Sequence, residues 1–398
     1  MPRRILLFAL LALAAWYVVL PSVYGRFRTL ADRSPRECRA GSPGDPAGKT
    51  YPSASPIVKV LQLTDSGELV DRCRWTDTLY ELVKVAGPKR VFVYVHGWRH
   101  SSDPQDTDLQ QFTRLVARAT DSEKEAGGHR HVVGIYVGWD AATPIPMLEY
   151  ATFWDRKRTA DRISQSAIFA KLIGAVRNIL HQQEAARASS TARDQLIVIG
   201  HSFGARIVYS ALAQAMILQL QAAHPGKPGG MYKPVAAAVD LAVLLNPALE
   251  AGAYSAFDSV RRYQERFVDA QPPLMLTIAA DNDAATRWAF PIGAWVGLAR
   301  SEREMTTLGN YPEFFTHELA VDSRQNGPAL RGDWAREYCS SGLCLNRTDR
   351  LQLYNPFFVA TTSAAVIDGH NGIWGERFQA WLWDVFNSLD TGGAALPN

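Results

Sequence analysis

The sequence predicts an α/β protein with a mostly parallel, doubly wound sheet, on three observations. Short apolar segments alternate along the chain with longer segments whose apolar residues recur at helical spacing. The short segments are apolar on both faces, as strands buried in a parallel sheet are. A chain of 398 residues with 47% hydrophobic residues is long enough for one large domain with a full core, or for two smaller ones.

The amino terminus predicts a targeting segment. Residues 1–4 include two arginines, and residues 5–20 contain no charged or strongly polar residue. This pattern is typical of a signal peptide or membrane anchor over residues 1–26. An uncleaved anchor is favoured, because residues 23–25 make a poor cleavage site. The positive flank directs the rest of the chain to the extracytoplasmic side, either anchored or secreted. Residues 27–56, rich in Pro, Gly, Ser and charge, follow as a linker.

The four cysteines agree with an extracytoplasmic location. An even number of cysteines outside a reducing compartment predicts two disulfides, which would join Cys339 to Cys344 and Cys38 to Cys73. Four unpaired thiols are the alternative. A zinc site is disfavoured, because the chain has no Cys-x-x-Cys pair.

Residues 57–398 are predicted to form one domain that opens with a β-hairpin. Its two strands would be residues 57–63 and 69–75, on either side of a turn signal at 65–67. A short helix is expected around residues 78–85. The later strands are predicted at 90–95, 132–137, 196–199, 241–245, 274–280 and 357–367, and the clearest helices at 163–180, 207–218 and 378–389.

One segment, residues 288–353, interrupts this alternation. It is too long for a plain crossover, and it contains several aromatic residues together with Cys339 and Cys344. We interpret it as an inserted cap beside the site, between the seventh and eighth predicted strands. A surface decoration without a role in substrate choice is the alternative.

The strongest functional signal is the pentapeptide Gly200-His201-Ser202-Phe203-Gly204. It follows a buried strand and precedes a helix, which is the context that a Gly-x-Ser-x-Gly nucleophile turn requires. The turn is so sharp that residues two before and two after the serine must lack side-chain bulk. Ser202 is therefore the predicted nucleophile. His201 is expected to point away from the site.

A serine nucleophile needs a base and a carboxylate that orients the base. His370 follows the last predicted strand and is the expected base, with His317 in the inserted segment as its rival. Asp281 and Asp283 both follow the strand at 274–280, and Asp283 is preferred because it lies further into the loop.

Stabilising the negative charge on the substrate oxygen requires backbone donors. One is the N–H of Phe203, directly after the nucleophile. The other is expected from the loop after the strand at 90–95, where Gly97 allows close approach and Trp98 supplies its N–H. The sequence therefore predicts an oxyanion hole formed by Trp98 and Phe203.

In these residues the chain resembles the α/β-hydrolase superfamily. The resemblance rests on His96-Gly97, the pentapeptide at 200–204, Asp283 and His370, in that order, and it spans roughly residues 88 to 390. The segments 138–140 and 150–156 also look like those of bacterial α/β-hydrolases of poorly assigned function. The resemblance implies hydrolysis of an ester, thioester or amide without a metal or organic cofactor, and it implies no particular substrate.

The expected function is that of a serine hydrolase acting on carboxylic esters, either esterase-like or lipase-like. Its partners would be a small-molecule or lipid ester and, through the amino-terminal segment, a membrane. The balanced charge of 42 basic and 39 acidic residues argues against nucleic-acid binding. An acyltransferase using the same three residues, or a non-catalytic envelope binding protein, are the alternatives. Oligomeric state stays open.

Overall fold

The computed structural model describes most of the chain from residue 57 onward. The described residues are 57–125, 127–128, 130–141, 149–187, 192–224, 233, 235–236, 238–263, 271–291, 301–323, 334, 337–348 and 355–389. The predicted anchor at 1–26, the linker at 27–56 and Cys38 lie outside these residues, so those predictions are not tested.

A ten-stranded mixed sheet organises the domain, in the order β1-β3-β2-β4-β5-β6-β10-β7-β9-β8. The pairs from β1 to β7 are parallel, and the last two pairs, β7 with β9 and β9 with β8, are antiparallel. The strands are β1 (Ile57–Gln62), β2 (Lys89–Val95), β3 (His131–Gly138), β4 (Gln195–His201), β5 (Leu241–Leu245), β6 (Met275–Ala280), β7 (His317–Val321), β8 (Glu337–Ser340), β9 (Leu343–Arg347) and β10 (Phe357–Thr362). This confirms the predicted α/β class and the mostly parallel sheet.

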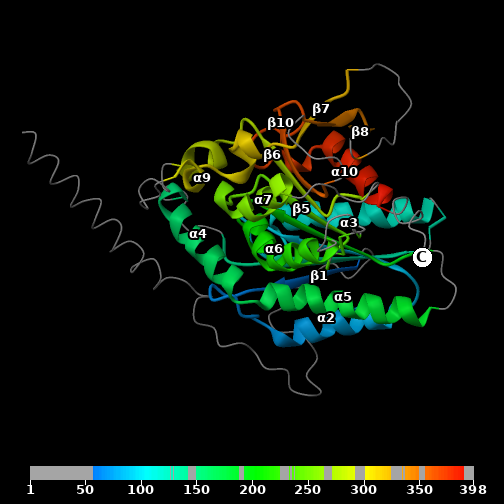
Figure 1. The fold of residues 1–398 in the computed structure, drawn as a ribbon. Helices are drawn as coiled ribbons and strands as arrows, with labels where there is room; N and C mark the ends of the chain where they lie inside the picture. Colours follow the sequence, from blue (N-terminus) through cyan, green and yellow to red (C-terminus); the bar gives the residue numbers. More distant parts are fainter. Residues whose placement is uncertain are drawn as a thin grey trace, which may run out of the picture.

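Helices cover both faces of the sheet (Figure 1). One face packs against α2 (Arg72–Lys84), α4 (Glu149–Gln165), α5 (Ile168–Ala186) and α6 (Phe203–Ala223), whose apolar residues share one core cluster. The other face packs against α3 (Thr107–Glu125) and α10 (Glu376–Ser388), which belong to a second cluster. Shorter helices are η2 (Ala251–Tyr254), α7 (Ser255–Tyr263), η3 (Ala285–Ala289), α9 (Glu302–Met305), η4 (Leu308–Asn310), η5 (Pro312–Phe314) and η6 (Gly372–Trp374).

Strand β2 shows why these segments are apolar throughout. Alternate side chains of a strand point to opposite faces. Val91, Val93 and Val95 accordingly join the first cluster, whereas Phe92 and Tyr94 join the second. All five are fully buried, so a polar group on either face is removed from water and needs a partner, as the Tyr94 hydroxyl has in Asp108.

The predicted hairpin at 57–75 is wrong. Strand β1 pairs in parallel with β3, and only an isolated antiparallel bridge joins Leu63 to Leu69. The chain then enters α2, because the carboxylate of Asp71 accepts hydrogen bonds from the backbone N–H groups of Cys73 and Arg74. This N-cap satisfies free donors at the start of a helix, a signal that outweighs the alternating pattern.

The predicted cap at 288–353 is wrong for β7, β8 and β9, which begin at residue 317 and extend the sheet. Strand β7 pairs in parallel with β10, and the hairpin of β8 and β9 adds to β7 (Figure 1). The short helix η4 packs instead against β6, where a Cβ on Gly309 would lie 2.1 Å from the Cβ of Ala279. The segment also starts after the sixth strand rather than the seventh, because residues 69–75 form no strand.

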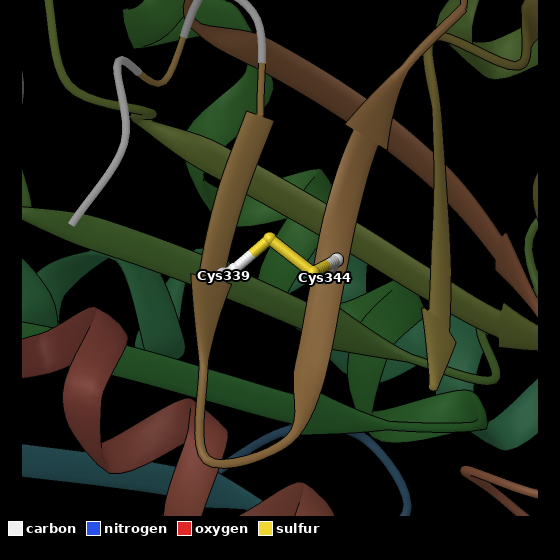
Figure 2. The surroundings of a disulfide bond; sticks show 2 residues. All are labelled: Cys339 and Cys344. Carbon is white, nitrogen blue, oxygen red and sulfur yellow. A yellow bond between two sulfur atoms is a disulfide. The ribbon is translucent and has the colours of Figure 1, made fainter. Parts of the chain in front are cut away.

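Cys339 and Cys344 form a disulfide with a Cα–Cα distance of 4.1 Å. They are directly opposite each other on β8 and β9 (Figure 2). The turn between the strands is Ser341-Gly342, and both residues have positive φ, at 49° and 73°. Such a two-residue turn matches the twist of the flanking strands. The predicted pairing of these two cysteines is confirmed, whereas that of Cys73 with Cys38 stays a prediction.

Among the residues that the structure describes, α6 is the one helix with the length and apolar composition of a membrane span. Just over half of its most apolar stretch, 56%, is buried inside the protein. It packs beneath the sheet against α4 and α5, as the core helix of a globular domain does.

Candidate active site

Ser202 lies at a sharp turn between β4 and α6. Its backbone has φ 56° and ψ −119°, a conformation that non-glycine residues rarely adopt. A Cβ on Gly200 would lie 2.5 Å from the Cα of Ala205, and a Cβ on Gly204 would lie 2.0 Å from the carbonyl oxygen of Val95. These contacts are with backbone atoms, so both positions accept only glycine, as the sequence reasoning required.

His370 connects the hydroxyl of Ser202 to the carboxylate of Asp283. Its Nε2 is 2.8 Å from Ser202 Oγ, and its Nδ1 is 2.7 Å from Asp283 Oδ2. Because an ionised carboxylate only accepts, the proton of neutral His370 resides on Nδ1. Nε2 is then free to accept the proton of the serine hydroxyl, which is the arrangement that a general base needs.

The carboxylate of Asp283 is fully buried and fully hydrogen-bonded. Oδ2 also accepts from the hydroxyl of Thr286 at 2.7 Å, and Oδ1 accepts from the backbone N–H groups of Ala285 and Thr286. Burial is the largest influence and opposes ionisation. The adjacent His370 and the Thr286 donors outweigh it and hold the pKa of Asp283 below its usual range.

The two alternatives from the sequence have other surroundings. Asp281 is exposed, and its backbone rather than its carboxylate bonds Thr362 and Arg287. His317 is buried at the start of β7, where its Nδ1 hydrogen-bonds Thr316 Oγ1 and its ring lies 4.0 Å from that of Phe358. Burial first, and then the charge of Arg347, lower the pKa of His317 to about 3. The structure therefore brings Ser202, Asp283 and His370 together.

Gly97 lies directly against the nucleophile. A Cβ on Gly97 would be 2.6 Å from the Cβ of Ser202, so the backbone that continues into Trp98 passes beside it. Phe203 is the first residue of α6, where backbone N–H groups lack an intrahelical partner and a negative charge is favoured. The side chains of Trp98 and Phe203 both pack on Phe153, with ring-centroid distances of 5.2 and 5.0 Å respectively. The oxyanion role of their N–H groups stays a prediction.

His96 holds this loop in place. Its Nε2 accepts a hydrogen bond of 2.9 Å from the backbone N–H of Trp139, its Nδ1 donates to the carbonyl of Gly97, and the indole of Trp139 donates to the His96 carbonyl. Burial lowers the pKa of His96 to about 4, so the ring is neutral at physiological pH. The rings of His96 and Trp139 are stacked.

Sequence reasoning missed two residues at the site, His201 and Asn246. The expectation that His201 points away is wrong, because its ring lies 4.9 Å from that of His370 and its Nε2 bonds the His370 carbonyl. Asn246 follows β5, and its side-chain amide bonds the same carbonyl. A signal for Asn246 was available, since it is a polar residue at the carboxyl end of a buried parallel strand.

One group of side chains in the described part of the chain has donor atoms close enough to share a metal ion: Asp322, Cys339 and Cys344. The two sulfur atoms are joined in the disulfide. A disulfide offers no thiolate, which is the form of cysteine that binds metals.

Comparisons with known proteins identify no family for this chain. No family model matches the sequence, and no curated protein matches it significantly. A search of solved structures finds the crystal structure of an uncharacterized protein from Pseudomonas aeruginosa, at 10% identity and a TM-score of 0.30. The match covers 79% of this chain and 47% of that chain, so this chain spans about half the length of its neighbour. A likeness this low supports no conclusion about fold family or function.

Proposed function

We propose that the chain is a serine hydrolase of the α/β-hydrolase fold that cleaves carboxylic esters through an acyl-enzyme. The observation that carries the proposal is the hydrogen-bonded series from Ser202 Oγ through the His370 imidazole to the Asp283 carboxylate, with distances of 2.8 and 2.7 Å. The order Ser, Asp, His along the chain, with the serine on a strained turn from strand to helix, is that of this fold.

In the first half of the proposed reaction, Ser202 Oγ attacks the acyl carbon while His370 Nε2 takes the hydroxyl proton. Asp283 holds the Nδ1 proton and stabilises the imidazolium that forms. The backbone N–H groups of Phe203 and Trp98 donate to the developing oxyanion, each contributing a few kcal/mol. His370 then gives its proton to the leaving alcohol, and the ester bond breaks.

In the second half, water replaces the alcohol. His370 Nε2 takes a proton from the water as its oxygen attacks the acyl carbon, and returns that proton to Ser202 Oγ as the acid leaves. No redox change occurs. The binding energy of the acyl and alcohol groups would set the substrate preference. Ser202, His370 and Asp283 act on the reacting atoms and do not determine that preference.

The proposal is tested by labelling the full-length chain with a fluorophosphonate and measuring the intact mass. This probe needs an activated serine but no knowledge of the substrate. We expect one adduct on the wild type and none on Ser202→Ala. The matched control is Ser210→Ala, an exposed serine on the same helix, which should label as the wild type does. Ser202→Ala should also lower ester turnover by about 10⁴-fold or more.

Absence of an adduct on a folded wild-type chain would contradict the proposal and favour a binding protein on this fold. Labelling of Ser202→Ala at the wild-type rate would place the reactive group elsewhere. Where labelling is specific to Ser202, products formed with and without an added alcohol separate hydrolysis from acyl transfer.

A further inference from the structure

We propose that His201 and Asn246 are positioning residues that hold the main chain of the base, His370, from beneath the site. The carbonyl oxygen of His370 accepts two hydrogen bonds, at 2.9 Å from His201 Nε2 and at 2.8 Å from Asn246 Nδ2. This inference rests on the proposed function, because it assigns a purpose to two side-chain donors that bond the loop of the base.

Both donors are fully buried, and they come from the ends of two neighbouring strands. His201 is the last residue of β4, and Asn246 follows the last residue of β5. Two fully buried donors on one carbonyl oxygen use both of its lone pairs. The position of His370 is therefore set by its backbone as well as by the partners of its imidazole.

The amide of Asn246 is oriented by a third bond. Its Oδ1 accepts from the backbone N–H of Ala280 at 2.8 Å, so Nδ2 must face the loop of the base, where it also lies 3.1 Å from the Gly369 carbonyl oxygen. Ala280 ends β6, three residues before Asp283. One side chain thus ties the strand that carries the acid to the loop that carries the base.

The backbone conformation at position 246 favours asparagine over most other residues. Its φ is 42°, in the left-handed region that asparagine tolerates better than most residues. Its own N–H donates to the carbonyl of Ile278, so the backbone is also held by β6. A residue kept in this conformation and bonded at both ends of its amide has little freedom to move.

His201 carries the proton that this role needs. A carbonyl oxygen only accepts, so Nε2 of His201 must be protonated. Burial first, and then the charge of nearby His370, lower the pKa of His201 to about 3, so the ring is neutral. Its Nδ1 has no hydrogen-bond partner in the described part of the chain.

That unpaired nitrogen is costly for stability, by about 1–3 kcal/mol. A leucine or phenylalanine of similar volume would avoid the cost. The side chain is therefore poorly explained by packing, and the bond to His370 is the one hydrogen bond of its ring in the described part of the chain, because Asp108 Oδ2 lies 3.9 Å from Nδ1.

The functional reason is that proton transfer tolerates only a small displacement of the reacting groups from each other. A displacement of about 1 Å between reacting groups can lower a rate about 100-fold. On its outer side the same loop is held by Asn282, whose side chain bonds Asp368 and the Gly369 N–H. The His201 and Asn246 donors hold the same loop on its buried side.

The test compares variants at His201 in the full-length chain, using the second-order rate constant of fluorophosphonate labelling. His201→Leu removes the donor, and we expect labelling about 100-fold slower. His201→Gln can place an amide N–H near the same point and should recover most of the wild-type rate. Asn246→Asp keeps the acceptor for Ala280 but turns a carboxylate toward the carbonyl oxygens, so it should also be slow.

The matched control is Thr277→Val. Thr277 is fully buried on β6, and its hydroxyl has no hydrogen-bond partner among the described residues. This variant changes a buried polar group on the strand that precedes Asp283 and leaves the hydrogen bonds of the His370 loop in place, so its labelling rate should equal that of the wild type.

A second readout is the far-downfield proton NMR signal of His370 Nδ1–H, assigned by its loss in His370→Gln. We expect it in the wild type, Thr277→Val and His201→Gln, and broadened by exchange in His201→Leu. Wild-type labelling and an unchanged signal in His201→Leu would overturn the positioning role while leaving the proposed hydrolase intact. A wild type that does not label would instead contradict the hydrolase, and the NMR signal alone would then decide whether His201 positions His370.

Discussion

At the scale of single residues, the Asp283 carboxylate determines which nitrogen of His370 carries the proton. Oδ1 is occupied by two backbone N–H groups, so Oδ2 is the oxygen that faces Nδ1. In Asp283→Asn the amide oxygen would keep the backbone donors. The amide nitrogen would then face Nδ1, which would have to accept, and the ring proton would move to Nε2.

We therefore expect Asp283→Asn to lower the fluorophosphonate labelling rate constant by about 10⁴-fold, the cost typical of a wrong histidine tautomer. Asp281→Asn is the control, because it makes the same change two residues away on an exposed side chain. Equal losses in both variants would contradict the assignment of Asp283. Circular dichroism checks that both variants are folded.

At the scale of elements, the first turn of α6 is tied to its surroundings by ion pairs. Arg206, four residues after Ser202, contacts Asp161 of α4 and Glu250 after β5. Lys157 of α4 contacts Glu250 at 3.0 Å. These side chains are half-buried, so the pairs are screened less than surface pairs are, and they fix α6 relative to α4 close to the nucleophile.

The edge hairpin of β8 and β9 contributes to stability without contributing to the site. Removing its disulfide with the double variant Cys339→Ser and Cys344→Ser should lower the free energy of unfolding by about 2 kcal/mol, the chain-entropy value for so short a loop. The labelling rate of Ser202 should not change, because β7 separates the hairpin from β10. Urea unfolding measures the change in the free energy of unfolding. A lower labelling rate in the folded variant would show that the hairpin reaches the site.

At the scale of the whole molecule, three neutral buried histidines make stability depend on pH. Burial lowers the pKa of His96 to about 4 and of His201 and His317 to about 3, from 6.5 in the unfolded chain. The unfolded state therefore binds more protons below pH 6.5. His100 has the opposite effect, because Asp106 and Asp108 outweigh burial and raise its pKa, so its contribution to stability is present below pH 6.5 and is lost at higher pH.

The three depressed histidines should consequently make the free energy of unfolding fall as the pH falls from 6.5 toward 4, whereas His100 should make it fall as the pH rises above 6.5. The slope contributed by each histidine approaches about 1.4 kcal/mol per pH unit. His317 lies outside the site, and His317→Phe removes one of the three histidines. The variant should therefore reduce the slope by about a third of the combined contribution of the three. Urea unfolding at several pH values between 4.5 and 7 tests this, and an unchanged slope in the variant would contradict it.

Some of the architecture was predictable because it depends on neighbours along the chain. Strand β2 is apolar on both faces, and Gly200 and Gly204 flank Ser202, so the buried strand and its sharp turn could be read locally. The helix expected around residues 78–85 in fact begins at residue 72, and its first turns were missed because a single cap, Asp71, outweighed an alternating pattern. Strand β7 was missed because its parallel partner, β10, comes later in the chain, and β8 and β9 join the sheet through β7.

The sequence by itself determined the α/β class, the position of the strained serine and a short set of candidate partners for it. These follow from periodicity, residue volume and the order of polar residues after apolar strands. Only the tertiary structure decided between Asp281 and Asp283 and between His317 and His370, and only it revealed His201 and Asn246. The reason is distance along the chain: His370 meets Asp283 from 87 residues away and Ser202 from 168. Contacts at that separation depend on how the sheet assembles, which no local pattern encodes.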